Sequence, residues 1–94
     1  MKLKLVTWEG DLTQFLVDAE DNIEAIEIAK NANRAIDRNY KYDPEDEDDA
    51  SHLRNVEDSS CYEVEDVDNL NMLESLMFRP DCGGMYGGAI VFWD

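Results

Sequence analysis

The residues from Lys2 to Trp8 divide between two faces with a period of two, which is expected of a β-strand. Between Lys2 and Trp8 one face would carry Leu3, Leu5 and Thr7, and the other Lys4, Val6 and Trp8. Gly10 then supplies a turn residue that tolerates positive φ. Leu12 to Asp18 returns as a second strand, so residues 2–18 predict a β-hairpin.

The period changes to that of a helix after residue 20. Asp21 is placed to cap the helix, and Glu24 stands three residues on, in the capping-box position. Arg34 and Arg38 near the end suit the negative pole of a helix dipole. The pattern predicts a helix from about residue 22 to about residue 38. Its expected apolar stripe is Ile23, Ile26, Ala29, Ala32, Ala35 and Ile36.

The chain changes character at Asp43. Six of the seven residues 43–49 are acidic. A run of like charges repels itself and is typical of a solvated segment. We therefore predict that residues 43–60 form an acidic loop.

The remaining third alternates again and then becomes apolar. Cys61 to Val67 predicts a third strand with one acidic face. Asp68 can cap a short helix that ends before Pro80. Its inner side would carry Leu70, Leu73, Leu76 and Met77. Residues 82–88 predict a flexible Gly-rich turn, and residues 89–93 predict a final strand buried on both faces.

These elements predict one α+β domain over residues 1–94, in the order β-β-α-β-α-β. We expect a sheet of about four strands with one main helix packed on it. Ninety-four residues are enough for one small domain. We expect the aromatic side chains of Trp8, Phe15, Phe92 and Trp93 to lie in its core.

The formal net charge is −15, and most of it lies in one third of the chain. Residues 43–74 hold thirteen acids against Arg54 alone, a net charge of −12. Carboxylates this dense destabilise the compact state by repulsion, which makes the segment a candidate for function. The charge argues against direct binding to nucleic acid or to anionic lipid. We expect a strongly basic protein surface as the partner.

Nothing in the sequence indicates a membrane or secretory protein. No apolar run approaches the roughly 20 residues that span a bilayer, and the N-terminus is too polar for a signal peptide. We therefore expect a cytoplasmic location. Cys61 and Cys82 are expected to be reduced there, and they could pair only in an oxidising compartment.

The acidic segment has three possible uses. It could mimic a nucleic-acid backbone, because proteins that bind duplexes do so through basic grooves that a carboxylate array can fill. It could bind Ca²⁺, but neither acidic window has the loop glycine and terminal glutamate of an EF-hand. It could also be a solubilising surface without a partner. Mimicry and the solubilising surface both stay open, whereas the metal site is disfavoured.

One feature favours a binding function. Acids continue from the predicted loop onto the predicted strand and helix, where carboxylates are held at fixed spacing. A surface that blocks a groove needs fixed spacing, and a solubilising tail does not. The candidate partner-binding residues are Glu45, Asp46, Glu47, Asp48, Asp49, Glu57, Asp58, Glu63, Glu65, Asp66 and Asp68.

The sequence shows no pattern for catalysis, a cofactor or a metal. His52 is the only histidine, and we expect it at the surface. The Gly-rich turn 83–88 lacks the ending of a P-loop and precedes a strand. Met85 and Tyr86 at its tip could be exposed contacts for a partner. We predict a protein that is not an enzyme.

In size, charge and simple α+β layout, the chain resembles the small acidic proteins that bacteriophages use against host defences. These include DNA-mimicking anti-restriction and anti-CRISPR proteins. The resemblance lies in composition and in segment 43–74. It implies a phage-encoded inhibitor that binds a defence nuclease or a CRISPR complex in the host cytosol and excludes nucleic acid. The class shares no catalytic site, so no residue role is carried over.

Two other functions stay open. The chain could be an acidic binding module for another basic host protein. It could also be a small ligand-binding protein, for example a nucleotide sponge, that uses the Gly-rich turn 83–88.

Overall fold

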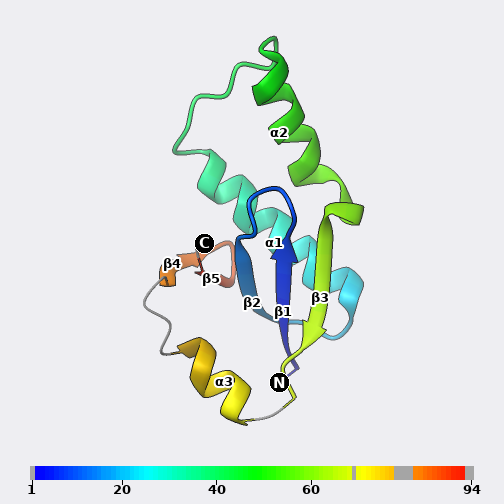
Figure 1. Cartoon of the computed structure of the whole chain (residues 1–94), viewed down its shortest axis with the longest axis vertical. Coiled ribbons are helices and arrows are strands. Elements are labelled where there is room, and N and C mark those ends of the chain that lie inside the picture. Colours follow the sequence, from blue (N-terminus) through cyan, green and yellow to red (C-terminus); the bar gives the residue numbers. More distant parts are fainter. Residues whose placement is uncertain (1, 69, 78–81, 93–94) are drawn as a thin grey trace.

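The structure, a computed structural model, describes residues 2–68, 70–77 and 82–92. Its elements are β1 (Leu3–Trp8), β2 (Gln14–Asp18), α1 (Asn22–Asp37), α2 (Glu47–Glu57), the 3₁₀ turn η1 (Ser59–Cys61), β3 (Tyr62–Asp66), α3 (Leu70–Met77), β4 (Cys82–Tyr86) and β5 (Ala89–Phe92). The strands form one antiparallel sheet in the order β3-β1-β2-β5-β4 (Figure 1). The predicted α+β class is confirmed, although five strands replace about four and α2 is an additional helix.

The two faces of the sheet are covered by different helices. On the α1 face, Val6 lies opposite Phe15, and both belong to the larger apolar core. On the other face, Leu5 lies opposite Leu16, and Leu76 of α3 completes a smaller core. The predicted division of β1 into two faces is therefore confirmed. The expected core positions of Trp8, Phe15 and Phe92 are also confirmed, whereas Trp93 lies outside the described residues.

Helix α1 begins where the sequence predicts. Asp21 caps it, because its side-chain oxygen Oδ1 accepts a hydrogen bond from the backbone N–H of Glu24 at 2.8 Å. The buried face is centred on Ala25, Ala29 and Ala32, whose small side chains let the helix lie close to the sheet. The predicted burial of Ile23 is wrong: it is 77% exposed, because it falls beside this alanine stripe.

The predicted loop over residues 43–60 is wrong for most of its length, because α2 occupies residues 47–57 and η1 occupies residues 59–61. Asp46 caps α2 by accepting hydrogen bonds from the backbone N–H groups of Asp48 and Asp49, at 2.9 and 3.2 Å. Carboxylates in a first helical turn lie at the positive end of the helix dipole. That placement offsets part of the repulsion that favoured a loop.

Helix α2 is also tied to the domain by its last turns. The Val56 side chain is 2% exposed and belongs to the larger core. The indole Nε1 of Trp8 donates a hydrogen bond to the carbonyl oxygen of Asn55 at 3.0 Å. Buried apolar contact, rather than helix propensity, therefore holds this acidic helix in place.

The predicted turn over residues 82–88 is largely an ordered hairpin of β4 and β5. Gly87 and Gly88 have φ of +54° and +87°, as a two-residue type I′ turn requires. A Cβ on Gly87 would lie 2.9 Å from the backbone nitrogen of Ala32, so the turn packs closely on α1. Met85 is 71% exposed, as expected. Tyr86 is partly buried against the core, so its expected exposure is wrong.

Strand order also decides whether the two cysteines of one molecule can meet. Cys61 directly precedes β3, and Cys82 begins β4, at the opposite edge of the sheet. Four strand spacings separate these edges by about 19 Å, far beyond the Cα separation of a disulfide. Cys61 is accordingly a free thiol. Among the described helices, none is long and apolar enough to cross a membrane.

Candidate functional site

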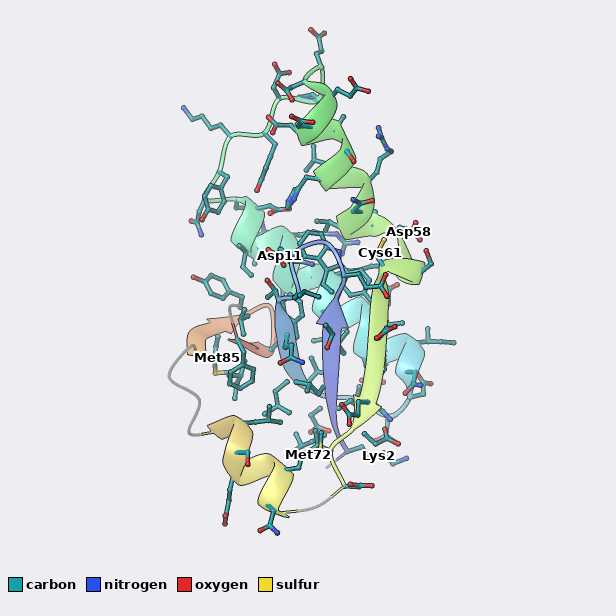
Figure 2. The ribbon with its side chains drawn as sticks, viewed as in Figure 1. Lys2, Asp11, Asp58, Cys61, Met72 and Met85 are labelled. Carbon is teal, nitrogen blue, oxygen red and sulfur yellow. The ribbon has the colours of Figure 1, made fainter. Side chains whose placement is uncertain are left out.

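The candidate acids follow one side of the molecule instead of gathering in one cluster. Residues 45–49 lie at the start of α2, Glu57 and Asp58 lie where α2 meets η1, and residues 63–68 lie on or just after β3. We call this run the acidic edge and define it by the eleven candidate residues. Figure 2 shows carboxylate oxygens at the outer end of α2 and along β3, with Asp58 between them. The edge therefore extends along most of the 45 Å long axis.

At the outer end of α2, the acids divide into structural and unpaired groups. Asp46 caps the helix, and Asp49 accepts a hydrogen bond from the backbone N–H of Asp43 at 2.9 Å. These two carboxylates stabilise the local backbone. The side chains of Glu45, Glu47 and Asp48 have no hydrogen bond or ion pair to any residue that the structure describes. These three are free to meet a partner.

At the junction of α2 and η1, both acids are engaged. Arg34 of α1 binds the Glu57 carboxylate with two hydrogen bonds, of 2.7 Å from Nε and 2.6 Å from Nη2. This pair lowers the pKa of Glu57 and raises that of Arg34. Asp58 caps η1, and hydrogen bonds from the hydroxyl and backbone N–H of Ser60 lower its pKa. Glu57 and Asp58 therefore join elements of the fold.

The acids of β3 lie on opposite faces of the sheet. Register places Glu63 beside Thr7 and Glu65 beside Leu5, on the face away from α1. Both glutamates are exposed and have no polar partner among the described side chains. Asp66 points to the α1 face, where the buried Lys4 donates a hydrogen bond to it at 2.5 Å. Glu63 and Glu65 are therefore the available charges of this strand.

The acidic edge ends where lysines begin. Asp68 lies beyond β3 and lines a depression of about 390 Å³ with Lys2, Lys4 and Glu20. Lys2 also pairs with Glu20 at 3.2 Å. The lysines offset the negative charge here, so the strongest uncompensated charge lies on α2 and the first residues of β3.

Sequence reasoning missed a second feature, a groove between α1 and α2. It has a volume of about 500 Å³, and its walls include Arg38, Tyr40, Tyr42 and Leu53. Partial burial raises the pKa of Tyr42, with a further contribution from nearby Asp37. The aromatic pair Tyr40 and Tyr42 before the acidic run was the available signal. The groove depends on α2, which the sequence did not predict.

His52 is the centre of the contacts beside this groove, and its side chain is 28% exposed, so the predicted surface position is confirmed only in part. Its ring stacks on Tyr42 at 4.5 Å and meets Trp8 edge-on at 5.4 Å. Its Nε2 lies 3.1 Å from Oδ1 of Asp37. These contacts join α1, α2 and β1.

The described part of the chain holds no group of three or more His, Cys, Asp or Glu residues placed to bind a metal ion. Comparison of the chain with protein-family models, with curated proteins and with solved structures gave no match.

Proposed function

We propose that this protein inhibits a nucleic-acid-binding protein by occupying its basic surface with the acidic edge. The observation that carries the proposal is that most of the unpaired acids lie on regular secondary structure. Glu47 and Asp48 lie on α2, and Glu63 and Glu65 lie on β3. Both elements are joined to the same core. The charges therefore have a fixed spacing, which a groove-filling surface needs.

The length and charge of the edge suit this role. One strand of B-form DNA carries a phosphate about every 3.4 Å of axis. A stretch as long as the molecule, 45 Å, would therefore present about thirteen phosphates on one strand. The acidic edge contains eleven acids, of which Glu57 and Asp66 are paired with Arg34 and Lys4. The remaining nine acids approach the number of phosphates over a comparable length.

The role proposed for the carboxylates is electrostatic and involves no catalysis. Lysine and arginine side chains of the target would displace the cations associated with these carboxylates, as they displace condensed cations from a nucleic acid. Such association is fast at low salt and weakens as salt rises. The target we propose is a host defence nuclease or a CRISPR complex, in line with the resemblance to phage inhibitors of these systems.

The test is competition with nucleic acid. The chain is immobilised and exposed to nuclease-treated bacterial lysate, and the captured proteins are eluted with duplex DNA. Polyglutamate at the same charge concentration is the control for simple anion exchange. Release of nucleic-acid-binding proteins by duplex at a lower concentration than by polyglutamate supports mimicry. Captured proteins that duplex cannot displace would identify the chain as a binding module for another basic protein instead.

A matched pair of variants shows whether the edge is responsible. Glu63→Gln with Glu65→Gln removes two charges from β3. Glu24→Gln with Glu74→Gln removes two exposed charges elsewhere, from α1 and α3. We expect the first pair to weaken capture and the second to leave it nearly unchanged. Equal effects would mean that total charge, and not the acidic edge, causes the capture.

A further inference from the structure

Among the described strands, none pairs with the outer hydrogen-bonding edge of β3. β3 is the first strand of the sheet and pairs with β1 alone among the described strands. The ladder has a continuous register from Lys4–Asp66 to Trp8–Tyr62. An edge strand of this kind presents backbone N–H and C=O groups to which a further strand can bind.

The hydrogen bonds at the two ends of the ladder show which groups face outward. Val67 donates its N–H to the carbonyl of Leu3 at 3.0 Å, and Glu9 donates its N–H to the carbonyl of Cys61 at 2.8 Å. In an antiparallel pair, hydrogen-bonded and non-bonded positions alternate. Glu63 and Glu65 therefore direct their backbone groups to β1. Val64, between them, directs its N–H and C=O away from the sheet.

The residues on either side of Val64 determine how many outward backbone groups β3 can offer to an added strand. The N–H of Tyr62 is already bonded to the carbonyl of Ser59, which leaves the Tyr62 carbonyl on the outer side. By the same alternation, Asp66 presents its N–H outward. A short extended segment could therefore bind at Tyr62, Val64 and Asp66 without disturbing any bond of the ladder.

The opposite edge of the sheet is built differently. The pairing of β4 with β5 has an irregularity between Cys82 and Gly84. Bulges of this kind protect an edge against the addition of a strand. β3 has no such irregularity, and the charge of its side chains is its protection. These negative side chains repel an acidic strand and attract a basic one.

That charge selects the occupant. A second copy paired at β3 would place its own acids near Glu63 and Glu65, and like charges opposite one another are destabilising. A strand with basic residues at those two positions would be attracted instead. The residue between them would lie beside Val64 on the α1 face, where Val64 and Ile26 are partly buried against the core. That position favours an apolar side chain.

We propose that β3 accepts an added antiparallel strand from the basic partner, with lysine or arginine at two alternate positions and an apolar residue between them. This inference rests on the proposed function, because it describes how the same partner meets the acidic edge. Main-chain bonds to Val64 would fix the register, and Glu63 and Glu65 would select the sequence.

The test uses a blocked peptide, valine-arginine-valine-arginine-valine, in calorimetry with the full chain. Its first control is the same peptide with an N-methyl group on the central valine, which removes the N–H that would bond to the carbonyl of Val64 and keeps the charge. We expect binding at least about tenfold weaker, which corresponds to about 1.4 kcal/mol. Equal binding of the two peptides would show charge attraction alone and would overturn the proposal.

Two measurements on the protein complete the test. Val64→Pro removes an outward N–H, which an edge strand tolerates, and replaces a side chain that is only partly buried, so it should keep the fold and lose the peptide. Hydrogen exchange of the wild-type protein gives a readout that needs no variant. Saturating peptide should slow exchange of the Val64 amide, whereas the Glu63 and Glu65 amides are already bonded to β1. An unchanged exchange rate at Val64 in the presence of bound peptide would contradict strand addition.

The outcomes separate this inference from the proposed function. If the peptide does not bind but duplex DNA still displaces captured proteins, strand addition is wrong and the proposed function stands. If the peptide binds as described but duplex displaces nothing, β3 is a site for basic strands and nucleic-acid mimicry is wrong.

Discussion

The hydroxyl group of Tyr62 donates a hydrogen bond of 2.6 Å to the carbonyl oxygen of Val56. The phenol oxygen of Tyr62 in turn accepts a hydrogen bond from Nδ2 of Asn33 at 2.9 Å. One buried phenol thus joins β3, α2 and α1. This contact fixes α2 relative to β3, so the two halves of the acidic edge belong to one rigid surface.

Removing that hydroxyl should destabilise the protein. Tyr62→Phe would leave the Asn33 amide and the Val56 carbonyl without this partner in a buried place, which costs about 1–3 kcal/mol. Urea denaturation at neutral pH measures the loss. Tyr40→Phe is the control, because Tyr40 is 62% exposed and its change should leave the unfolding midpoint unaltered. A Tyr62→Phe variant as stable as the wild type would show that the buried bonds contribute nothing net.

The same phenol predicts a loss of stability in alkali. Burial raises the pKa of Tyr62 to about 12, from 10.0. The unfolded chain therefore loses this proton at a lower pH than the folded chain does. The stability that depends on the protonated phenol is complete below about pH 10 and falls as pH rises toward 12. We expect the difference in stability between the wild type and Tyr62→Phe to shrink over this range. A constant difference would contradict the raised pKa.

The two turn glycines provide a matched pair for the packing of the hairpin on α1. Both have positive φ, so alanine is strained at either position by about 1 kcal/mol or more. At Gly88 the new methyl group would meet open space, whereas at Gly87 it would meet the α1 backbone at Ala32. We expect Gly87→Ala to be more destabilising than Gly88→Ala in thermal unfolding. Equal losses would mean that backbone strain alone matters.

The sequence predicted those elements whose pattern is set by local chemistry. The hairpin of β1 and β2, the Asp21 cap of α1 and the alternation of Tyr62 to Asp66 follow from periods of two or of 3.6 residues. The exposure of Ile23 was not predictable in this way. Several neighbouring residues of α1 are apolar, and the sheet packs against the alanines among them.

Prediction from the sequence failed where tertiary contacts override the local preference of the chain. Six acids in seven residues predict a loop, but the burial of Val56 and the bonds to Trp8 and Tyr62 stabilise α2 beside them. Four glycines in seven residues predict a flexible turn, but pairing with β5 orders them as β4. The acidic edge was predicted by residue. Its division into caps, ion pairs and unpaired charges required the structure.

Two neighbouring acids just before α2, Glu45 and Asp46, should differ in their effect on stability. Asp46→Ala removes the cap from the Asp48 and Asp49 amides and should cost about 0.5–2 kcal/mol. Glu45→Ala removes the same charge from a side chain without a described partner. It should leave stability unchanged or slightly increased, because it relieves repulsion. Hydrogen exchange over residues 47–57 locates the difference. Faster exchange in both variants would mean that charge, and not capping, stabilises α2.

The unpaired acids should act collectively in binding. Each exposed ion pair contributes about 0–1 kcal/mol, so no single change among Glu45, Glu47, Asp48, Glu63 and Glu65 should abolish capture of the partner. Changing all five to their amides should weaken capture far more than any one change. The variant with all five changes should also be as stable to urea as the wild type, or more stable, because it removes like-charge repulsion. The control is Glu57→Gln, which breaks the pair with Arg34 and should lower stability while having little effect on capture. If the variant with all five changes binds its partner with unchanged affinity, the acidic edge is a solvated surface and the proposal of backbone mimicry fails.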